Sequence, residues 1–328
     1  MRAAWYQARG PAREVLVVGE MPDPRPGSGE VRIRVRYSGI NPGDLKKRTG
    51  WQGSPMPYPR VIPHSDGAGV IDAVGAGVPE ERVGTHVWCY GAQSYRPFGT
   101  AAEYVVVPEA LAVPLPGPGY EDQAACLGIA GITAHRAIFA DGSVDGLDVL
   151  VHGATGGVGA IAVQLARRDG ARVIATVRKE EQLHLARSLG ASHALLASAP
   201  GLAQQIREIA PDGVHRIAEV DFAAHIDLDS KVLAVGGVVC SYYSSDSRPE
   251  IPYWQLAFAD VTLRLLGSDD FTPEVKAEAA AQLTDALLGG GLTSRIAAEL
   301  PLEEIAQAHD LVERGAGGRV LLDLDHPG

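Results

Sequence analysis

The chain has 328 residues, of which 46% are hydrophobic and 21% are charged, with a formal net charge of −11 at pH 7. A chain of this length and composition buries about three quarters of its unfolded surface, which excludes disorder over most of its length. The negative charge repels phosphate backbones and disfavours binding to nucleic acid or to anionic membranes. No apolar run reaches the roughly 18 residues of a membrane helix, and residues 1–10 lack the apolar core of a secretory signal, so we expect neither.

The three cysteines, Cys89, Cys126 and Cys240, are far apart in the sequence. Their odd number argues against a disulfide framework, and no pair has the spacing of a zinc-binding motif. We therefore expect a reduced protein located in the cytoplasm.

Residues 1–120 have the pattern of β-strands. Residues 31–37 alternate apolar and charged side chains with a period of two, which predicts a strand with one solvated face. Residues 69–74 and 102–107 are further β-like segments, and clusters of proline and glycine separate them. Since no stretch with helical periodicity competes with these segments, we expect an antiparallel barrel or twisted sheet.

The pattern changes near Tyr120, and from there strand-like and helix-like segments alternate. In chain order, the sequence predicts a strand at 149–152, a helix at 160–168, a strand at 172–177, a helix at 180–189, strands at 217–220 and 232–239, a helix at 274–288 and a strand at 319–324. The first three of these elements form a βαβ unit and a further helix follows it, so we expect an α/β region with a parallel sheet.

The turn between the first of these strands and its helix is the most informative part of the sequence. It contains an Ala-for-first-Gly form of the dinucleotide fingerprint, in which Gly156 lets the backbone approach a pyrophosphate and Gly159 permits close packing of helix on strand. The flanking strands and helix supply the context that the motif needs, although a glycine-rich turn without a ligand is the alternative. The predicted phosphate-binding residues are Ala154, Thr155, Gly156, Gly157, Val158 and Gly159.

The residues after the second strand of this unit indicate which dinucleotide binds. An acidic residue at that place would bind the adenosine ribose hydroxyl and select NAD. The strand is followed instead by Arg178 and Lys179, and these cations favour the 2′-phosphate of NADPH. The alternative is that both are ordinary solvated residues that pair with Glu180 and Glu181.

Five short segments are modest alone and specific together, because of their order and spacing. They are residues 38–42, 65–71, 99–104, 131–136 and 149–159. Together they resemble the zinc-free medium-chain dehydrogenases/reductases, and most closely the quinone oxidoreductase (zeta-crystallin-like) family. The resemblance covers nearly the whole chain.

The resemblance implies an α/β fold with two domains. A GroES-like, β-rich catalytic domain would contain residues 1–120 and be completed by a C-terminal segment, residues 267–328. A Rossmann domain with a doubly wound parallel sheet would contain residues 121–266 and bind NADPH. Members of this family place the active site in a cleft and commonly pair their Rossmann sheets edge to edge, so we expect a homodimer or a homotetramer.

The resemblance also implies that the site holds no metal. Zinc-dependent relatives have cysteine where this chain has Asn41, histidine where it has Ser65, and cysteine near Ile129, and none of these three residues suits a catalytic zinc ion. His64 lies one position from the ligand register, so we interpret it as a cleft-lining or hydrogen-bonding residue. Without a Lewis acid, the site favours quinones and enones, which spread the incoming electron pair by conjugation.

The resemblance points to three candidate catalytic residues. Asn41 matches the asparagine that lies beside the nicotinamide and the acceptor in quinone reductases, with an Asn-Pro turn residue as the alternative. Lys46 stands where the family often has tyrosine, and is either a cationic partner for a developing oxyanion or a solvated loop residue. Thr133 matches a threonine that packs on the nicotinamide, so Asn41 and Thr133 are also expected to contact the cofactor. Trp51 either stacks on a flat acceptor or caps the core.

Three further residues are expected to contact the cofactor. Ser241 and Tyr242 follow a predicted strand, at the edge of the sheet that faces the ligand in doubly wound folds. Arg319 lies in a segment similar to the family's Gly-Lys-x-x-Leu and is expected to contact a phosphate of the cofactor. Asp44 and Asp66 also match family positions, and we interpret them as structural.

The predicted function is that of an NADPH-dependent, zinc-independent reductase that transfers hydride to a small conjugated acceptor. Among such acceptors, the sequence favours a quinone. An enoyl or alkenal reductase that acts on a C=C bond uses the same fold and cofactor, so it is one alternative. A non-enzymatic NADPH-binding protein is the other, because this family also supplies lens crystallins.

Overall fold

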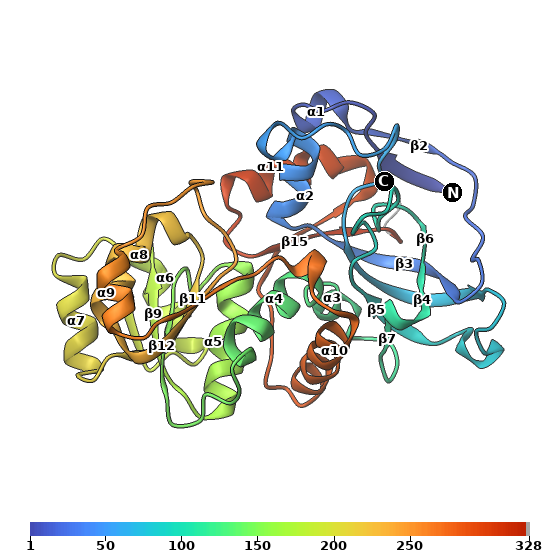
Figure 1. Ribbon diagram of the computed structural model, residues 1–328. Coiled ribbons are helices and arrows are strands. Elements are labelled where there is room, and N and C mark those ends of the chain that lie inside the picture. The colour runs from blue at the N-terminus through green and yellow to red at the C-terminus, as the bar shows by residue number, and fades with distance from the viewer. Residues whose placement is uncertain (326–328) are drawn as a thin grey trace. The chain divides into compact units, whose positions relative to one another are not determined.

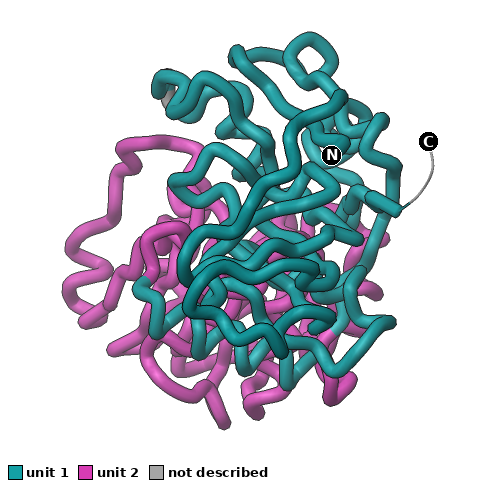
Figure 2. Tube along the Cα trace, turned by 90° about the vertical axis from the view of Figure 1, so that its right-hand side faces the viewer, with its two compact units in different colours: residues 1–130, 272–287, 293–328 teal, residues 131–271, 288–292 magenta. Residues whose placement is uncertain are grey.

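The computed structural model describes residues 1–325, and the chain divides into two compact units (Figure 1, Figure 2). Unit 1 contains Met1–Ala130, Thr272–Leu287 and the residues from Thr293 on, whereas unit 2 contains Gly131–Phe271 and Leu288–Leu292. Segments from both halves of the sequence therefore make up unit 1. The domain boundaries expected after residues 120 and 266 stay a prediction.

Unit 1 is built around a seven-stranded sheet with the order β14-β15-β3-β4-β5-β7, in which β6 also pairs with β3. All neighbouring strands are antiparallel except β14 and β15, which are parallel. The strands are β3 (Glu30–Gly39), β4 (Asp66–Val74), β5 (His86–Cys89), β6 (Tyr104–Pro108), β7 (Ala112–Pro114), β14 (Ile296–Pro301) and β15 (Arg319–Asp323). A separate ribbon pairs β1 (Arg2–Trp5) with β2 (Val17–Glu20).

The alternation predicted for residues 31–37 is present in β3. Val31, Ile33 and Val35 are at most 2% exposed and pack in the core of unit 1, while the arginines between them lie on the opposite, more solvated face. The segments predicted at 69–74 and 102–107 fall in β4 and β6. The predicted β-rich, largely antiparallel region is therefore confirmed.

The prediction that no helix competes in residues 1–120 is wrong. Helix α2 (Pro42–Thr49) begins where Asp44 Oδ2 accepts the backbone N–H of Asn41 at 2.7 Å, with proline at its first position, and it ends at Gly50, whose φ is 98°. Eight residues are too few for a clear period. The other helices of this unit are α1 (Ala12–Val15), α3 (Glu121–Ala124), α10 (Pro273–Leu288) and α11 (Ile305–Arg314), with 3₁₀ turns η1 (Trp51–Gly53), η2 (Glu80–Arg82), η3 (Glu109–Leu111) and η5 (Leu302–Glu304).

Unit 2 contains a six-stranded sheet in which every neighbouring pair is parallel, with the order β10-β9-β8-β11-β12-β13. Its strands are β8 (Asp148–Val151), β9 (Arg172–Val177), β10 (His193–Leu196), β11 (Val214–Glu219), β12 (Leu233–Ser241) and β13 (Thr262–Leu265). This is the strand order of the doubly wound dinucleotide-binding fold, whose switch point here lies between β8 and β11. The predicted Rossmann sheet is confirmed.

The helices of unit 2 alternate with these strands along the chain. They are α5 (Gly157–Asp169), α6 (Glu181–Ser188), α7 (Leu202–Ile209), α8 (Phe222–Val232) and α9 (Tyr253–Phe258), with a 3₁₀ turn η4 (Ser268–Asp270). Helix α4 (Gly128–Phe139) starts in unit 1 and continues in unit 2. Among all helices described, none has the length and apolar character needed to span a bilayer.

Candidate active site

The glycine turn of unit 2 connects β8 to α5. Gly153 has a φ of 63°, and a Cβ atom on Gly159 would lie 2.3 Å from the Gly153 carbonyl oxygen, so only glycine permits this approach of helix to turn. Gly156 and Gly157 are exposed at the start of α5. The Gly156 N–H donates to the Gly153 carbonyl oxygen at 2.9 Å, whereas the N–H groups of the first helical turn, from Gly157 on, have no partner within the helix. The turn therefore has the features of an anion-binding site, because Gly159 packs against its inner side and the backbone at the start of α5 is accessible to solvent.

The cations predicted to select NADPH follow β9 directly. Arg178 and Lys179 are both exposed. Lys179 Nζ lies 3.7 Å from Glu181 Oε1. For Lys179, the structure therefore has the pairing with a neighbouring glutamate that was the alternative to phosphate binding. Within residues 1–325, Arg178 has no ion-pair or hydrogen-bond partner, so its guanidinium is the cation available to a phosphate.

Ser241 and Tyr242 lie at the carboxyl end of β12, and both are tied to neighbouring backbone. Ser241 Oγ donates a hydrogen bond to the Tyr243 carbonyl oxygen at 3.0 Å, and the Tyr242 backbone N–H donates to the Glu219 carbonyl oxygen at 3.1 Å. The Tyr242 hydroxyl is buried, and burial raises the pKa of this group. The side chain of Tyr242 therefore points inward rather than into a surface turn. Thr133 lies on α4 and is buried.

In unit 1, the structure brings Asn41 and Arg319 together. Arg319 Nη1 donates to Asn41 Oδ1 at 2.8 Å, and Asn41 Nδ2 donates to Asp66 Oδ2 at 2.7 Å. Asp66 also accepts the backbone N–H of Ile129 on both carboxylate oxygens at 3.0 Å. Because the amide oxygen faces a guanidinium and the amide nitrogen faces a carboxylate, the orientation of the Asn41 side chain is fixed.

Asp44 lies one helical turn from Asn41 and is buried. Burial raises the pKa of this carboxyl to about 7, with Lys47 and the Asn41 hydrogen bond opposing the rise. Asp44 thus caps α2, which is the structural role expected for it. Its buried carboxyl group also titrates near neutral pH.

Lys46 and Trp51 contact each other. Lys46 Nζ lies 4.8 Å from the centroid of the Trp51 ring, a cation–π arrangement, and Trp51 is 45% exposed. Trp51 therefore does not cap the core. The two side chains form one aromatic and cationic surface in unit 1, whose contact with an acceptor stays a prediction.

His64 belongs to a buried chain of hydrogen bonds that the sequence did not reveal. Arg48 Nε donates to His309 Nδ1 at 3.3 Å, so the His309 proton is on Nε2 and is donated to His64 Nε2 at 2.9 Å. His64 Nδ1 then donates to Ser38 Oγ at 2.8 Å. The series continues through a threonine hydroxyl to a backbone carbonyl oxygen, in one direction throughout.

Both imidazoles in this chain are neutral. Burial lowers the pKa of His64 well below its usual range and that of His309 to about 3, with Arg48 adding to the shift of the latter. Since both nitrogens of His64 are used in hydrogen bonds, this residue is a hydrogen-bonding residue of the core. No local signal could have found its partner, because His309 is 245 positions away.

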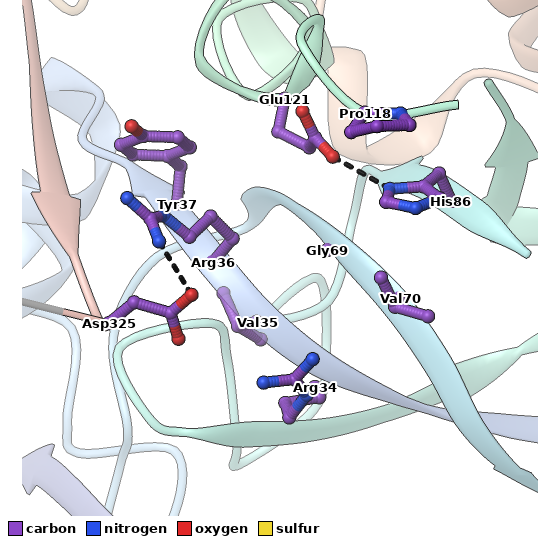
Figure 3. Close-up of a pocket in the computed structure, with 10 residues that line it drawn as sticks. All are labelled: Arg34, Val35, Arg36, Tyr37, Gly69, Val70, His86, Pro118, Glu121 and Asp325. Atoms are coloured by element: carbon purple, nitrogen blue, oxygen red, sulfur yellow. Dashed lines mark hydrogen bonds and ion pairs between the residues drawn. The ribbon is translucent and has the colours of Figure 1, made fainter. Parts of the chain in front are cut away.

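A pocket of about 310 Å³ opens beside β3 and β4 of unit 1, and Figure 3 shows its polar lining. Two pairs of its ionisable groups already contact each other: Arg36 Nη1 lies 2.6 Å from Asp325 Oδ2, and His86 Nδ1 lies 2.7 Å from Glu121 Oε1. None of the predicted site residues lines it. We therefore do not place the candidate active site there.

Comparison with known proteins shows to which family the chain is related. Residues 27–117 match the family model described as alcohol dehydrogenase GroES-like domain, and residues 157–280 match that described as zinc-binding dehydrogenase. The quinone oxidoreductase of Rattus norvegicus is 32% identical over 305 residues, which covers 92% of this chain and 91% of the relative. The chain belongs to the quinone oxidoreductase family of the medium-chain dehydrogenases/reductases.

Other members of this oxidoreductase family are similarly related. The quinone oxidoreductase of Homo sapiens is 30% identical over 309 residues, covering 92% of this chain and 91% of the relative. A mycobacterial protein solved in complex with NADPH is 29% identical, with a TM-score of 0.86 and coverage of 99% of this chain and 100% of its own. The fold is therefore shared along the whole chain, GroES-like unit and Rossmann unit alike.

The zinc ion implied by one family model does not fit the residues at the three positions where zinc-dependent relatives have ligands. The Asn41 amide is bonded to Asp66 and Arg319, the Ser65 side chain is a buried hydroxyl, and Ile129 offers only hydrocarbon. An amide, a hydroxyl and an alkyl group do not make a zinc-binding set. These three positions therefore lack the ligands of a catalytic zinc ion.

The proton on Asp44 predicts a pH-dependent stability. The folded protein holds this proton up to about pH 7 and the unfolded chain only to the ordinary value of 3.8, so stability falls as pH rises between those values. Between about pH 5 and pH 8 the loss is about 2–3 kcal/mol in the free energy of unfolding. Urea denaturation of Asp44→Asn should lack this part of the loss, since the amide oxygen still caps α2. Asp212→Asn, at an exposed turn position, is the control, and an unchanged slope in Asp44→Asn would contradict the assignment.

Proposed function

We propose that the protein is an NADPH-dependent reductase that transfers hydride, without a metal, to a small conjugated acceptor, most of all a quinone. The observation that carries the proposal is the glycine turn with its exposed backbone, followed at the end of the next strand by the available cation Arg178. Membership of the quinone oxidoreductase family and likeness to an NADPH complex support the same cofactor. When bound, NADPH supplies the hydride.

The residues of unit 2 bind the cofactor. The N–H groups at the start of α5 bind the pyrophosphate, the segment from Ala154 to Gly159 shapes the turn, and Arg178 with Lys179 binds the 2′-phosphate. Thr133 packs on the nicotinamide. The remaining contacts are assigned to Asn41, Ser241, Tyr242 and Arg319, of which Arg319 acts through its hydrogen bond to the Asn41 amide.

The residues of unit 1 orient the acceptor. The Asn41 amide nitrogen carries two N–H groups, of which Asp66 takes one and the acceptor oxygen is offered the other. The ammonium of Lys46 stabilises charge that develops on that oxygen, and the exposed face of Trp51 stacks on a flat ring. A conjugated acceptor needs no more than this, because it spreads the incoming electron pair over several atoms.

The first test measures NADPH oxidation with phenanthrenequinone, benzoquinone and a linear enone in parallel. We expect turnover of a quinone. In Asn41→Ala, kcat should fall by about tenfold or more while the KM for NADPH stays within about twofold, because the lost N–H acts on the acceptor. The control is Arg34→Ala, an exposed cation outside the site.

The other outcomes of this assay would overturn the proposal in distinct ways. Turnover of the enone alone would make the protein a C=C reductase. Tight NADPH binding with no turnover of any acceptor would favour the non-enzymatic alternative. A quinone reductase unaffected by Asn41→Ala would keep its activity assignment and lose Asn41 as a catalytic residue.

The cofactor preference has its own test. Arg178→Ala should raise the KM for NADPH by about tenfold to hundredfold and leave the KM for NADH unchanged, because it removes a charge-assisted contact to the 2′-phosphate only. Lys179→Ala should have a smaller effect, since Lys179 already pairs with Glu181. Equal losses for NADPH and NADH in steady-state kinetics would contradict the assignment.

We also propose that the protein is a homodimer joined along β13. This strand is the last in the unit 2 sheet, and no strand among those described pairs with its outer edge. Leu265 on β13 and Phe258 on α9 are 77% and 81% exposed, which gives the edge an apolar border. A second copy of the same strand satisfies both the backbone groups and the apolar side chains.

Light scattering after gel filtration should give the mass of a dimer. Leu265→Lys should give a monomer, because it places a charge in the apolar border, whereas Val83→Lys in unit 1 should not change the mass. A wild-type monomer, or a dimer that survives Leu265→Lys, would contradict this interface. A tetramer that falls to a dimer in Leu265→Lys would support it and indicate a second one.

The three cysteines support a location in the cytoplasm. Cys89, Cys126 and Cys240 are free and buried in the structure. A reducing compartment keeps such thiols unpaired, and no step of the proposed reaction uses them.

A further inference from the structure

Four titratable side chains meet at the carboxyl ends of β8 and β11 in unit 2. His152 follows β8, Glu219 ends β11, and His225 and Asp229 lie one turn apart on α8. His152, Glu219 and Asp229 are fully buried, and His225 is partly exposed. The proposed reductase activity uses none of them.

Each carboxyl group of this cluster has one oxygen in use and one without a partner. Asp229 Oδ1 accepts a hydrogen bond from His152 Nε2 at 3.0 Å, and Glu219 Oε1 accepts one from His225 Nδ1 at 2.8 Å and another from the Asp221 backbone N–H. Within residues 1–325, Asp229 Oδ2 and Glu219 Oε2 have no hydrogen-bond partner, although both are buried. Glu219 Oε2 lies 3.7 Å from the same His152 Nε2 atom that donates to Asp229 Oδ1, so both carboxyl groups face one ring nitrogen.

Two buried carboxyl groups at one site need a positive species between them. Two carboxylates at short range cannot both stay ionised without a proton or a cation to offset their repulsion. His225 can offset part of this charge through Glu219 Oε1, and a shared proton or a metal ion can offset the rest.

We propose that His152 Nε2, Glu219 and Asp229 bind a divalent transition metal ion of the Zn²⁺ class. One imidazole and two carboxylates are ligands that such ions accept. Burial lowers the pKa of His152 to about 4, so its ring is in the neutral form that binds metal.

The neighbours of these three ligands orient them. Thr176 Oγ1 lies 2.8 Å from His152 Nδ1, on the side of the ring away from the site, and His225 holds Glu219 through Oε1. Such outer hydrogen bonds fix ligand orientation in metal sites. His225 acts in this outer position even though its ring nitrogen is near enough to bind. Its ring stacks on that of His152 with centroids 4.4 Å apart and planes at 19°, and parallel rings cannot both direct an in-plane lone pair at one ion.

Metal binding exchanges a proton for the ion. The ion takes the place of the shared proton, which Asp229 releases to solvent, and the His152 proton moves from Nε2 to Nδ1, where the Thr176 hydroxyl oxygen accepts it. Thr176 can accept this proton because its hydroxyl oxygen lies 2.8 Å from His152 Nδ1.

The test uses the full-length protein after chelator treatment, without NADPH. Isothermal titration with ZnCl₂ at about pH 8 should show one ion per chain, confirmed by elemental analysis after gel filtration, and thermal denaturation should shift upward. No binding at pH 8 would overturn the proposal and leave the cluster with its shared proton. These readouts do not depend on reductase activity, so the two proposals fail separately.

Asp229→Asn is the decisive variant. Its amide donates a hydrogen bond to Glu219 as the shared proton does, so the protein folds, while one charged ligand is lost and zinc binding should fall by at least about a hundredfold. His225→Asn removes only an outer contact and should weaken binding by about tenfold to hundredfold. His184→Asn on the exposed face of α6 is the control for surface histidines. Unchanged zinc binding in Asp229→Asn would place the ion elsewhere and overturn the assignment.

Discussion

A hydrogen atom is all that fits on the Cα of Gly159 where α5 lies against the turn that leads into it. Any larger side chain would meet the Gly153 carbonyl oxygen, so this contact fixes how near the helix stands to the sheet. Gly156 and Gly157 come to the surface where α5 begins, although the Gly156 N–H already donates to the Gly153 carbonyl oxygen, and His152, which precedes the turn, is fully buried. The exposed glycines of the predicted anion site and one member of the buried cluster therefore flank the same tight turn.

Unit 1 differs from unit 2 because it buries many polar groups, each of which needs a hydrogen-bond partner. Its chain of hydrogen bonds begins at Arg48, which can only donate, and ends at a backbone carbonyl oxygen, which can only accept. Both neutral imidazoles between them are therefore held in single tautomers. Beside this chain, Asp66 and Arg319 hold the Asn41 amide from its two ends. In the proposed reaction, rigidity of this kind would orient the acceptor without a metal ion.

Features that are local in sequence could be predicted, and features that depend on distant partners could not. The alternation in β3 and the glycine turn are visible because period and spacing report directly on burial and backbone approach. Helix α2 was missed because it has only about two turns and little apolar periodicity, and its N-terminal cap is what marks its start. Arg48 reads as part of a basic run, yet its partner His309 is 261 positions away. Glu219 and Asp229 lie in unremarkable strand and helix segments, and only the parallel sheet brings them to His152.

The buried thiols have a chemical consequence if the acceptor is a quinone or an enone, as proposed. Such acceptors are electrophiles, and thiolates add to them covalently. Burial raises the pKa of Cys89 to about 12 and that of Cys240 to about 11, and it raises the pKa of Cys126 as well, so almost no thiolate forms at neutral pH. The protein therefore resists alkylation by its own proposed substrates. A single cysteine introduced at the surface would, for the same reason, be the one site that a maleimide label reaches.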